Sequence, residues 1–297
     1  MSGAEAAYDW RSLPPATRPY AEVIGDPISQ SKSPKIHGFW LEKLEIAADY
    51  RAAHVLPGDL AEYLKARRAD AHWRGCNVTM PHKQAVMGLM NRLDDVATRI
   101  GAVNTVVADE GGGLTGHNTD AYGFSEPLLF EHGFHFTTEK SVLVIGNGGA
   151  ARAVVAELAQ RHVALTLAVR AREKGLKLLM ELAPGISHAV ADLLTIANPA
   201  EVKAARYDLV VNTSPLGMVG NPPLALDLSW VAPRGIVYDI VTAPLETELL
   251  KAAREAEFAT IDGLSMLIGQ ARGAFHLFFG RPPQYEWDAE LRRILTA

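Results

Sequence analysis

The stretch SVLVIGNGGAARAVVAELAQ, residues 141–160, decides the fold. Its first six residues are almost all apolar, which is typical of a strand buried in a parallel sheet. The turn GNGGAA (146–151) fits the pattern Gly-x-Gly-x-x-Ala, and a helix is predicted over residues 151–162. This succession predicts a dinucleotide-binding unit, because the glycines permit a tight turn and the helix N-terminus attracts phosphates. A glycine-rich turn without a ligand is the alternative. The candidate cofactor-binding residues here are Gly146, Asn147, Gly148, Gly149 and Ala150.

Strand-like apolar runs alternate with helix-like patterns along the rest of the chain. The predicted strands cover residues 21–25, 49–55, 75–80, 165–169, 208–214 and 236–241. The predicted helices begin at Ser33 and at Pro81 or cover residues 60–68, 121–132, 172–182 and 246–257, with more helix after Gly263. Residues 102–109 and 114–120 form a predicted hairpin. The alternation predicts an α/β fold with mostly parallel sheets, and 297 residues are enough for about two domains.

Composition restricts the possible functions of the chain. Charged residues make up 21% and hydrophobic residues 48%, which argues against a disordered protein. A net charge of −5 argues against a broadly basic surface, so neither nucleic acid nor a membrane is an expected partner. The single cysteine, Cys76, rules out an internal disulfide and favours the cytoplasm, and no metal-binding motif is present. Residues 1–19 lack the features of a secretory signal and are expected to be a frayed leader.

The second strand of the dinucleotide unit indicates which cofactor is bound. An NAD site usually has an Asp or Glu at the end of that strand, where it accepts a hydrogen bond from the ribose. Here Arg170 follows the strand and Lys174 lies four residues further on, with no acid before Glu173. Cations at this point favour the 2′-phosphate of NADP over NAD. The alternative is a solvated helix terminus, although cations are unfavourable in a first helical turn.

Hydroxyl groups gather before the first predicted helix. Ser31 and Ser33 precede Pro34, and a helix N-terminus with such hydroxyls can bind a carboxylate or a phosphate. Simple capping of the helix by Ser33 is the alternative, but it would not explain Ser31.

A second polar segment, NVTMPHK (77–83), follows a predicted strand. Alternation along the strand points Asn77 and Thr79 to one side. If Pro81 begins a helix, Lys83 lies in its first turn, where the helix dipole favours a neutral lysine suited to acid–base catalysis. The alternative is an exposed lysine without a catalytic role. Asp120 supplies a carboxylate at the predicted domain junction, unless it only caps the helix that follows.

These motifs together resemble the shikimate dehydrogenase family. The matching segments, in the family's order, are VIGDPISQSKSPKIH (23–37), CNVTMPHK (76–83), GAVNT (101–105), GHNTDAYG (116–123), VIGNGGAAR (144–152), NTSPLGM (212–218), VYDIVTAP (237–244) and GLSMLIGQA (263–271). The resemblance implies an N-terminal α/β/α substrate domain, residues 1–120 plus 262–297, and a C-terminal Rossmann domain for NADP, residues 121–261. It also implies an active site in the cleft between them and the reversible reduction of 3-dehydroshikimate to shikimate. We expect a monomer or a homodimer.

The resemblance also implies roles for individual residues. Lys83 and Asp120 would be the catalytic pair, and Ser31 and Ser33 would hold the substrate carboxylate. The other candidate substrate contacts are Asn77, Thr79, Asn104, Thr242 and Gln270. Beyond the glycine turn, the candidate cofactor contacts are Arg170, Lys174, Ile240 and Gly263.

Two positions depart from the family pattern. The second nucleotide strand ends in Val169-Arg170-Ala171 where the family usually has Asn-Arg-Thr, which weakens the expected preference for NADP. Thr242 stands where the family usually has a tyrosine, so the substrate range is open. The alternatives are a quinate or shikimate dehydrogenase with altered substrate or NAD preference, a folate-type methylene dehydrogenase, and a non-catalytic nucleotide-sensing relative.

Overall fold

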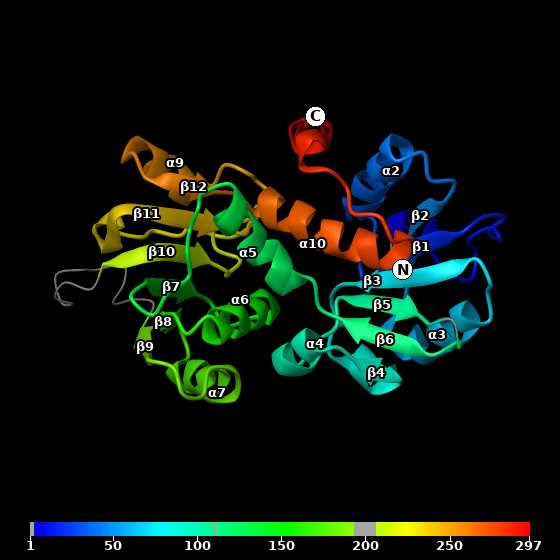
Figure 1. Ribbon diagram of the computed structural model, residues 1–297, viewed down its shortest axis with the longest axis horizontal. Helices are drawn as coiled ribbons and strands as arrows, with labels where there is room; N and C mark the ends of the chain where they lie inside the picture. The colour runs from blue at the N-terminus through cyan, green and yellow to red at the C-terminus, as the bar shows by residue number, and fades with distance from the viewer. Residues whose placement is uncertain (1–2, 110, 193–205) are drawn as a thin grey trace. The chain divides into compact units, whose positions relative to one another are not determined.

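The computed structural model describes residues 3–109, 111–192 and 206–297 (Figure 1). The chain divides into two compact units. Unit 1 comprises Met1–Thr119 and Gln270–Ala297, and unit 2 comprises Asp120–Gly269. The second boundary falls inside helix α10 (Gly263–Phe279). Within the described ranges, no helix is long and apolar enough to cross a membrane.

Unit 1 is built on a mixed sheet with the strand order β2-β1-β3-β5-β6-β4. The strands are β1 (Tyr20–Gly25), β2 (Asp49–His54), β3 (Trp73–Val78), β4 (Arg92–Leu93), β5 (Thr105–Ala108) and β6 (Leu114–His117). β1 is parallel to β2 and β3, because α2 (Ser33–Lys43) and α3 (Leu60–Arg68) form the crossovers between them. β5 and β6 form the predicted antiparallel hairpin. Further helical segments are α1 (Gly3–Ala6), α4 (Asp95–Ile100), α11 (Asp288–Thr296) and the 3-10 turns η1 (Pro57–Asp59), η2 (Ala85–Leu89) and η5 (Tyr285–Trp287).

Unit 2 contains a parallel sheet with the strand order β12-β11-β10-β7-β8-β9. The strands are β7 (Ser141–Ile145), β8 (Ala164–Val169), β9 (His188–Asp192), β10 (Tyr207–Asn212), β11 (Val231–Asp239) and β12 (Ala259–Ile261). The helices include α5 (Asp120–Phe130), α6 (Gly149–Gln160), α7 (Arg172–Leu182) and α9 (Glu248–Glu255). Counted from β7 along the chain, the order is 3-2-1-4-5-6, which is the order of a Rossmann fold. The predicted α/β fold with a Rossmann domain is therefore confirmed.

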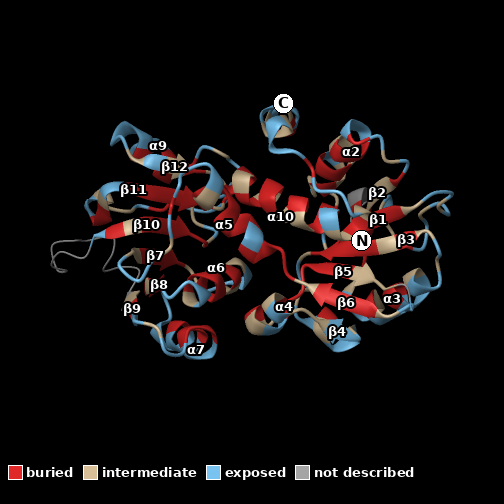
Figure 2. Ribbon diagram, in the orientation of Figure 1, coloured by how far each residue is buried: buried red, intermediate tan, exposed pale blue. Residues whose placement is uncertain are grey.

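The core of unit 2 explains why the run at residues 141–146 is apolar throughout. Val142 and Val144 pack into a cluster that includes residues of α6, while Leu143 and Ile145 pack into a second cluster with residues of α9. Helices thus cover both faces of β7, so alternate side chains are buried on either side. Figure 2 shows the same concentration of buried residues in the central strands.

The expectation of a frayed leader at residues 1–19 is wrong for the residues that the structure describes. Trp10 is only 7% exposed, and its ring packs edge-on against Tyr63 of α3. The Arg11 guanidinium donates hydrogen bonds to Asp59 and Glu62 at 2.9 and 2.8 Å. The segment shows no helical or strand periodicity in its sequence, because it is held by side chains some fifty residues further along the chain. The strands β4, β9 and β12 were also not predicted. β4 has two residues and β12 has three, which is too few for an alternating pattern.

Candidate active site

Unit 2 has a cavity of about 390 Å³ at the carboxyl ends of β7, β8 and β10. In this strand order the crossovers reverse direction between β7 and β10, and open α/β sheets bind ligands outside such a reversal. The lining residues are Gly146, Asn147, Gly148, Ala168, Val169, Arg170, Ala171, Lys174, Thr213, Ser214, Pro215, Leu216, Asn221 and Pro222. The structure therefore brings five of the predicted cofactor residues into one cavity.

Two features of the backbone explain why residue 146 is a glycine. Its φ of +109° is a conformation that other residues rarely adopt. A Cβ atom there would also lie 3.0 Å from Thr213 Oγ1 and 3.1 Å from the Ser214 backbone nitrogen. Gly146 therefore lets the turn after β7 pass close to the end of β10.

Gly148 and Gly149 need a different explanation. No heavy atom lies within 4 Å of a Cβ atom built on either residue, and the φ of Gly148 is an ordinary −80°. Nothing in the protein therefore requires glycine here, whereas a ligand that approaches the backbone would. Gly148 is the N-cap of α6, no side chain caps this end of the helix, and its first turn contains no acidic residue. These features fit a pyrophosphate bound to the helix N-terminus.

The residues after β8 fit a phosphorylated ribose. Arg170 and Lys174 are exposed and line the cavity, whereas Glu173 is absent from its lining. Arg172 is held elsewhere, since its guanidinium donates to the Val190 carbonyl at 2.6 Å. The cavity therefore offers two cations where an NAD site usually offers a carboxylate.

Thr213 and Ser214 on the β10 side of the cavity were missed as site residues. The Thr213 hydroxyl donates to the Ile145 carbonyl at 2.7 Å, and Ser214 donates to the Asn212 amide oxygen through both its N–H and its hydroxyl. The Asn212 amide nitrogen in turn donates to Asp239 at 2.9 Å. Burial raises the pKa of Asp239 despite its hydrogen bonds. The polar NTS segment (212–214) at the carboxyl end of a buried strand was the signal that could have found these residues.

Ile240 and Gly263 meet at another point of unit 2. A Cβ atom on Gly263 would lie 2.3 Å from the Ile240 carbonyl oxygen, so only glycine permits α10 to begin here. Thr242, two residues after Ile240, is half-buried. The structure thus pairs the two residues predicted to line the nicotinamide.

In unit 1, a hydrogen-bond network joins predicted substrate residues to residues that were not predicted. The Tyr50 hydroxyl donates to Asn77 Oδ1 at 2.6 Å, and the Asn77 amide nitrogen donates to Thr105 Oγ1 and to the Asn104 carbonyl at 3.0 and 3.3 Å. The Asn104 amide nitrogen donates to Thr119 Oγ1 at 3.0 Å, and its oxygen accepts from the Thr119 N–H at 2.8 Å. Because the amide nitrogen of Asn77 already makes two hydrogen bonds, the Asn77 side chain can act toward a ligand only as a hydrogen-bond acceptor.

Tyr50 connects this network to helix α2. Burial raises the pKa of Tyr50 well above its ordinary value, while a hydrogen bond with Ser33 acts in the opposite direction. The Tyr50 ring stacks on His37 with ring centroids 3.9 Å apart and planes 6° from parallel. Burial lowers the pKa of His37 to about 3, so its ring is neutral. Tyr50 is therefore held in a fixed orientation, with its hydroxyl toward Ser33 and Asn77.

The two predicted carboxylate-binding serines lie at the start of α2. Capping by Ser33 is wrong, because Ser33 is the first residue of the helix and the cap residue is Lys32, whose side chain makes no capping bond. Instead, Ser31 Oγ accepts a hydrogen bond from the Ser33 N–H at 3.3 Å. This hydrogen bond keeps the two serines close together at the start of α2. Thr79 lies on the neighbouring loop, where its methyl group occupies the space that a side chain at Gly25 would need.

The helix expected to begin at Pro81 does not form. Residues 80–84 are a turn followed by η2, and the Lys83 carbonyl accepts a hydrogen bond from the Val103 N–H at 2.8 Å. Lys83 therefore does not lie in the first turn of a helix, and the prediction that a helix dipole favours its neutral form is wrong. Lys83 is half-buried in unit 1, and Asp120 is the first residue of α5 in unit 2. Gln270 lies on α10.

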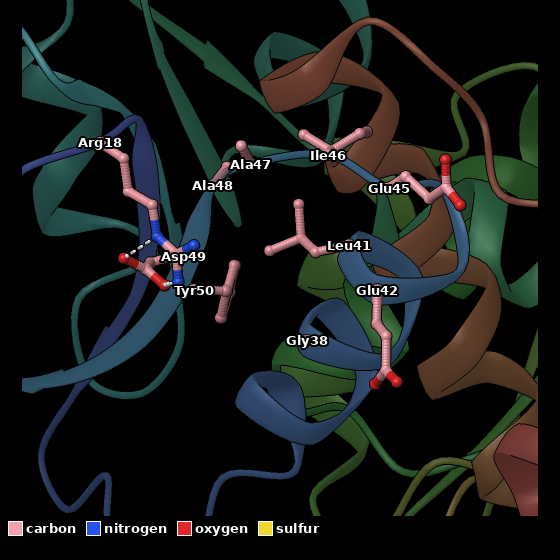
Figure 3. A pocket seen from close by; sticks show the side chains of 10 residues that line it. All are labelled: Arg18, Gly38, Leu41, Glu42, Glu45, Ile46, Ala47, Ala48, Asp49 and Tyr50. Atoms are coloured by element: carbon pink, nitrogen blue, oxygen red, sulfur yellow. Dashed lines mark hydrogen bonds and ion pairs between the residues drawn. The ribbon is translucent and has the colours of Figure 1, made fainter.

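Unit 1 also has a cavity of about 450 Å³ between α2 and β2 (Figure 3). Figure 3 shows Arg18 bonded to Asp49 at its edge, and the Arg18 Nε donates to this carboxylate at 2.8 Å. The charge of Arg18 is thus already neutralised, and Tyr50 is the one lining residue that belongs to the polar network. In the described ranges, no group of three or more His, Cys, Asp or Glu residues could hold a metal ion.

This chain is similar to known proteins in a family model, in a sequence relative and in solved structures. Residues 23–106 match the family described as the shikimate dehydrogenase substrate binding domain. A relative from Sphingopyxis alaskensis, "Shikimate dehydrogenase (NADP(+))", is 50% identical over 95% of this chain and 99% of its own length. The solved structure of shikimate 5-dehydrogenase from Thermus thermophilus with NADP(H) and shikimate is 31% identical, with a TM-score of 0.80 over 93% of this chain and 99% of that one. Quinate dehydrogenase from Corynebacterium glutamicum with NAD is 34% identical, with a TM-score of 0.82 over the same shares.

Proposed function

This chain belongs to the shikimate dehydrogenase family, and we propose that it catalyses the reversible NADP-dependent reduction of 3-dehydroshikimate to shikimate. The observation that carries the proposal is the cavity of unit 2, where open glycine positions at a helix N-terminus lie beside Arg170 and Lys174. The amide and hydroxyl network around Asn77 and Asn104 supports a polyhydroxylated ring as substrate.

We assign nucleotide binding to unit 2. Backbone N–H groups after Gly148 would hold the pyrophosphate, and Arg170 and Lys174 would hold the ribose 2′-phosphate. Ile240 and Gly263 would lie along the nicotinamide. When bound, NADPH supplies a hydride to the ring ketone of the substrate.

We assign substrate binding to unit 1. Ser31 and Ser33 would donate hydrogen bonds to the substrate carboxylate, while Thr79, Asn104 and Gln270 would contact ring hydroxyls. Hydrogen bonds to a charged group contribute about 1.5–3 kcal/mol each, so the two serines would account for much of the substrate affinity.

We propose Lys83 and Asp120 as the proton-transfer pair. Negative charge accumulates on the ketone oxygen as its carbon is reduced, and the Lys83 ammonium would donate a proton to that oxygen. A chain of backbone and side-chain contacts supports this pairing. The Lys83 carbonyl accepts a hydrogen bond from the Val103 N–H, and Asn104 follows Val103. The Asn104 side chain accepts a hydrogen bond from the Thr119 N–H, and Asp120 follows Thr119. Asp120 would orient the lysine. Acid–base catalysis of this kind accelerates reactions by roughly 10²–10⁴-fold.

A second candidate function is the oxidation of quinate or the use of NAD. Thr242 stands where the family usually has a tyrosine, and its shorter side chain would leave more room beside the substrate. The residues Val169 and Ala171 remove two polar side chains that the family usually places around the 2′-phosphate. Both departures would widen the choice of ring acid and of nucleotide.

One assay separates these candidates. Absorbance at 340 nm is followed with shikimate, with quinate and without substrate, each with NADP⁺ and with NAD⁺. Rapid reduction of NADP⁺ that depends on shikimate supports the proposed function. Turnover with quinate alone, or with NAD⁺ alone, supports the second candidate, and nucleotide binding without turnover of either acid contradicts both.

A further inference from the structure

The segment upstream of the first strand contacts the loop that carries Ser31 and Ser33. We propose that residues 3–12 hold the loop of residues 26–33 in the conformation that binds the substrate carboxylate, with Glu5 as the positioning residue. This inference rests on the proposed function. It assigns a role to a part of the chain that lies outside residues 23–106, the range of the family match.

The Glu5 carboxylate binds the loop directly. It is 6% exposed and accepts hydrogen bonds from the Ile28 N–H at 3.0 Å and from the Ser29 N–H at 3.1 Å. Although burial raises the pKa of Glu5, bonds from the Ser29 hydroxyl and from these two amides bring it below its ordinary value. Glu5 is therefore ionised at neutral pH, and an ionised acceptor makes stronger hydrogen bonds than a neutral one.

The same loop continues from Glu5 to the serines. The Ile28 carbonyl accepts from the Ser31 N–H at 3.0 Å, and Ser31 Oγ accepts from the Ser33 N–H at 3.3 Å. Ile28 is itself buried in a small apolar cluster against which Tyr8 packs. A change at Glu5 thus reaches Ser31 through one residue, without any contact between Glu5 and the substrate.

A second link runs through His54 at the end of β2. Its backbone N–H donates to the Tyr8 carbonyl at 2.6 Å, and its carbonyl accepts from the Trp10 N–H at 3.4 Å. The His54 ring lies 2.8 Å from Asp26 Oδ1, and Asp26 begins the loop. The segment therefore fixes the loop at residue 26 through His54 and at residues 28 and 29 through Glu5.

The negative charge of Glu5 allows the positioning role to be distinguished from simple electrostatic repulsion of the substrate. Glu5 adds a negative charge near a site proposed to bind an anion, so repulsion alone predicts tighter substrate binding when the charge is removed. A positioning role predicts the opposite, because the loop loses its hydrogen bonds to the Glu5 carboxylate. The sign of the change in KM for shikimate distinguishes the two.

The experiment compares Glu5→Ala, Glu5→Gln and the control Arg11→Ala in steady-state assays with shikimate and NADP⁺. Arg11 belongs to the same segment but binds Asp59 and Glu62, away from the loop. We expect Glu5→Ala to raise the KM for shikimate about tenfold, with kcat within about threefold and the KM for NADP⁺ unchanged. Glu5→Gln keeps one acceptor oxygen and should have an intermediate KM, and Arg11→Ala should resemble the wild type.

Three results would overturn the inference. The first is a KM for shikimate within about twofold of wild type in both Glu5 variants, in an otherwise active enzyme. The second is a lower KM, which would mean that charge repulsion dominates. The third is an equal rise in the KM values for shikimate and NADP⁺, which indicates general destabilisation. If Glu5→Ala does not fold, Glu5→Gln decides alone, and a wild type inactive on shikimate and quinate contradicts the proposed function itself.

Discussion

Replacement of Gly148 by alanine should weaken NADP binding while leaving the stability of the ligand-free protein nearly unchanged. A Cβ atom at this position meets no protein atom within 4 Å, and the backbone φ of −80° suits alanine. The methyl group would instead occupy the space over the N-terminus of α6, where we place the pyrophosphate. The substitution therefore separates a glycine kept for the ligand from one kept for the fold.

The expected magnitudes follow from the local geometry. Alanine is a poorer N-cap than glycine by roughly 0.5–1 kcal/mol, but it lowers the entropy of the unfolded chain by a similar amount, about 0.4–1 kcal/mol. The two effects nearly cancel, so the melting temperature should change by less than about 2 °C. Loss of one hydrogen bond to a charged phosphate costs about 1.5–3 kcal/mol, which raises the Kd for NADP⁺ roughly 10- to 150-fold.

The matched control is Gly146→Ala in the same turn. The φ of +109° and the close approach to Thr213 should cost about 1–3 kcal/mol in the folded state, or about 2–12 °C in melting temperature. Thermal unfolding without nucleotide and calorimetric titration with NADP⁺ measure both quantities. If Gly148→Ala loses several degrees of stability and keeps its affinity for NADP⁺, the reasoning is refuted.

Five further substitutions test the remaining assignments. Lys83→Ala should lower kcat, measured from the absorbance at 340 nm, by roughly 10²–10⁴-fold. An effect below about threefold would remove Lys83 from the mechanism. Ser31→Ala and Ser33→Ala should each weaken shikimate binding by about 1–3 kcal/mol, seen in KM, whereas a change confined to kcat would contradict a carboxylate contact. Arg170→Ala should reduce the ratio of NADP⁺ to NAD⁺ activity, and an unchanged ratio would contradict its contact with the 2′-phosphate. Thr242→Tyr should shift the ratio of shikimate to quinate turnover, and a constant ratio would count against a role in substrate choice.

The residues that line the cavity of unit 2 could be predicted from the sequence because their signals are local. The turn at residues 146–151 lies within ten residues of the strand and the helix that it joins, so the spacing alone predicts the geometry. The place of Arg170 in this cavity could be predicted for the same reason, since the end of the second strand follows at a nearly fixed distance in a Rossmann fold. Thr213 and Ser214 could have been found by applying that rule to the next strand beyond the reversal.

The substrate half was less predictable because its contacts join distant segments. Tyr50 and Asn77 are 27 residues apart, and Asn104 and Thr119 are 15 apart, so only strand order and register bring them together. The prediction for Lys83 assumed that a helix begins at Pro81, because proline is common at the first position of a helix. The structure has a turn there, and the Lys83 carbonyl accepts a hydrogen bond from the Val103 N–H.

By itself, the sequence determined the α/β class, the Rossmann unit and the family, because strand and helix periods and glycine spacing act over a few residues. Only the tertiary structure decided which parts of the fold residues 3–12 contact. Glu5 has no recognisable pattern around it, yet it is buried because Ile28 and Ser29 offer two amide hydrogens that need an acceptor. A buried polar group depends on its partner, and the partner's position depends on the whole sheet.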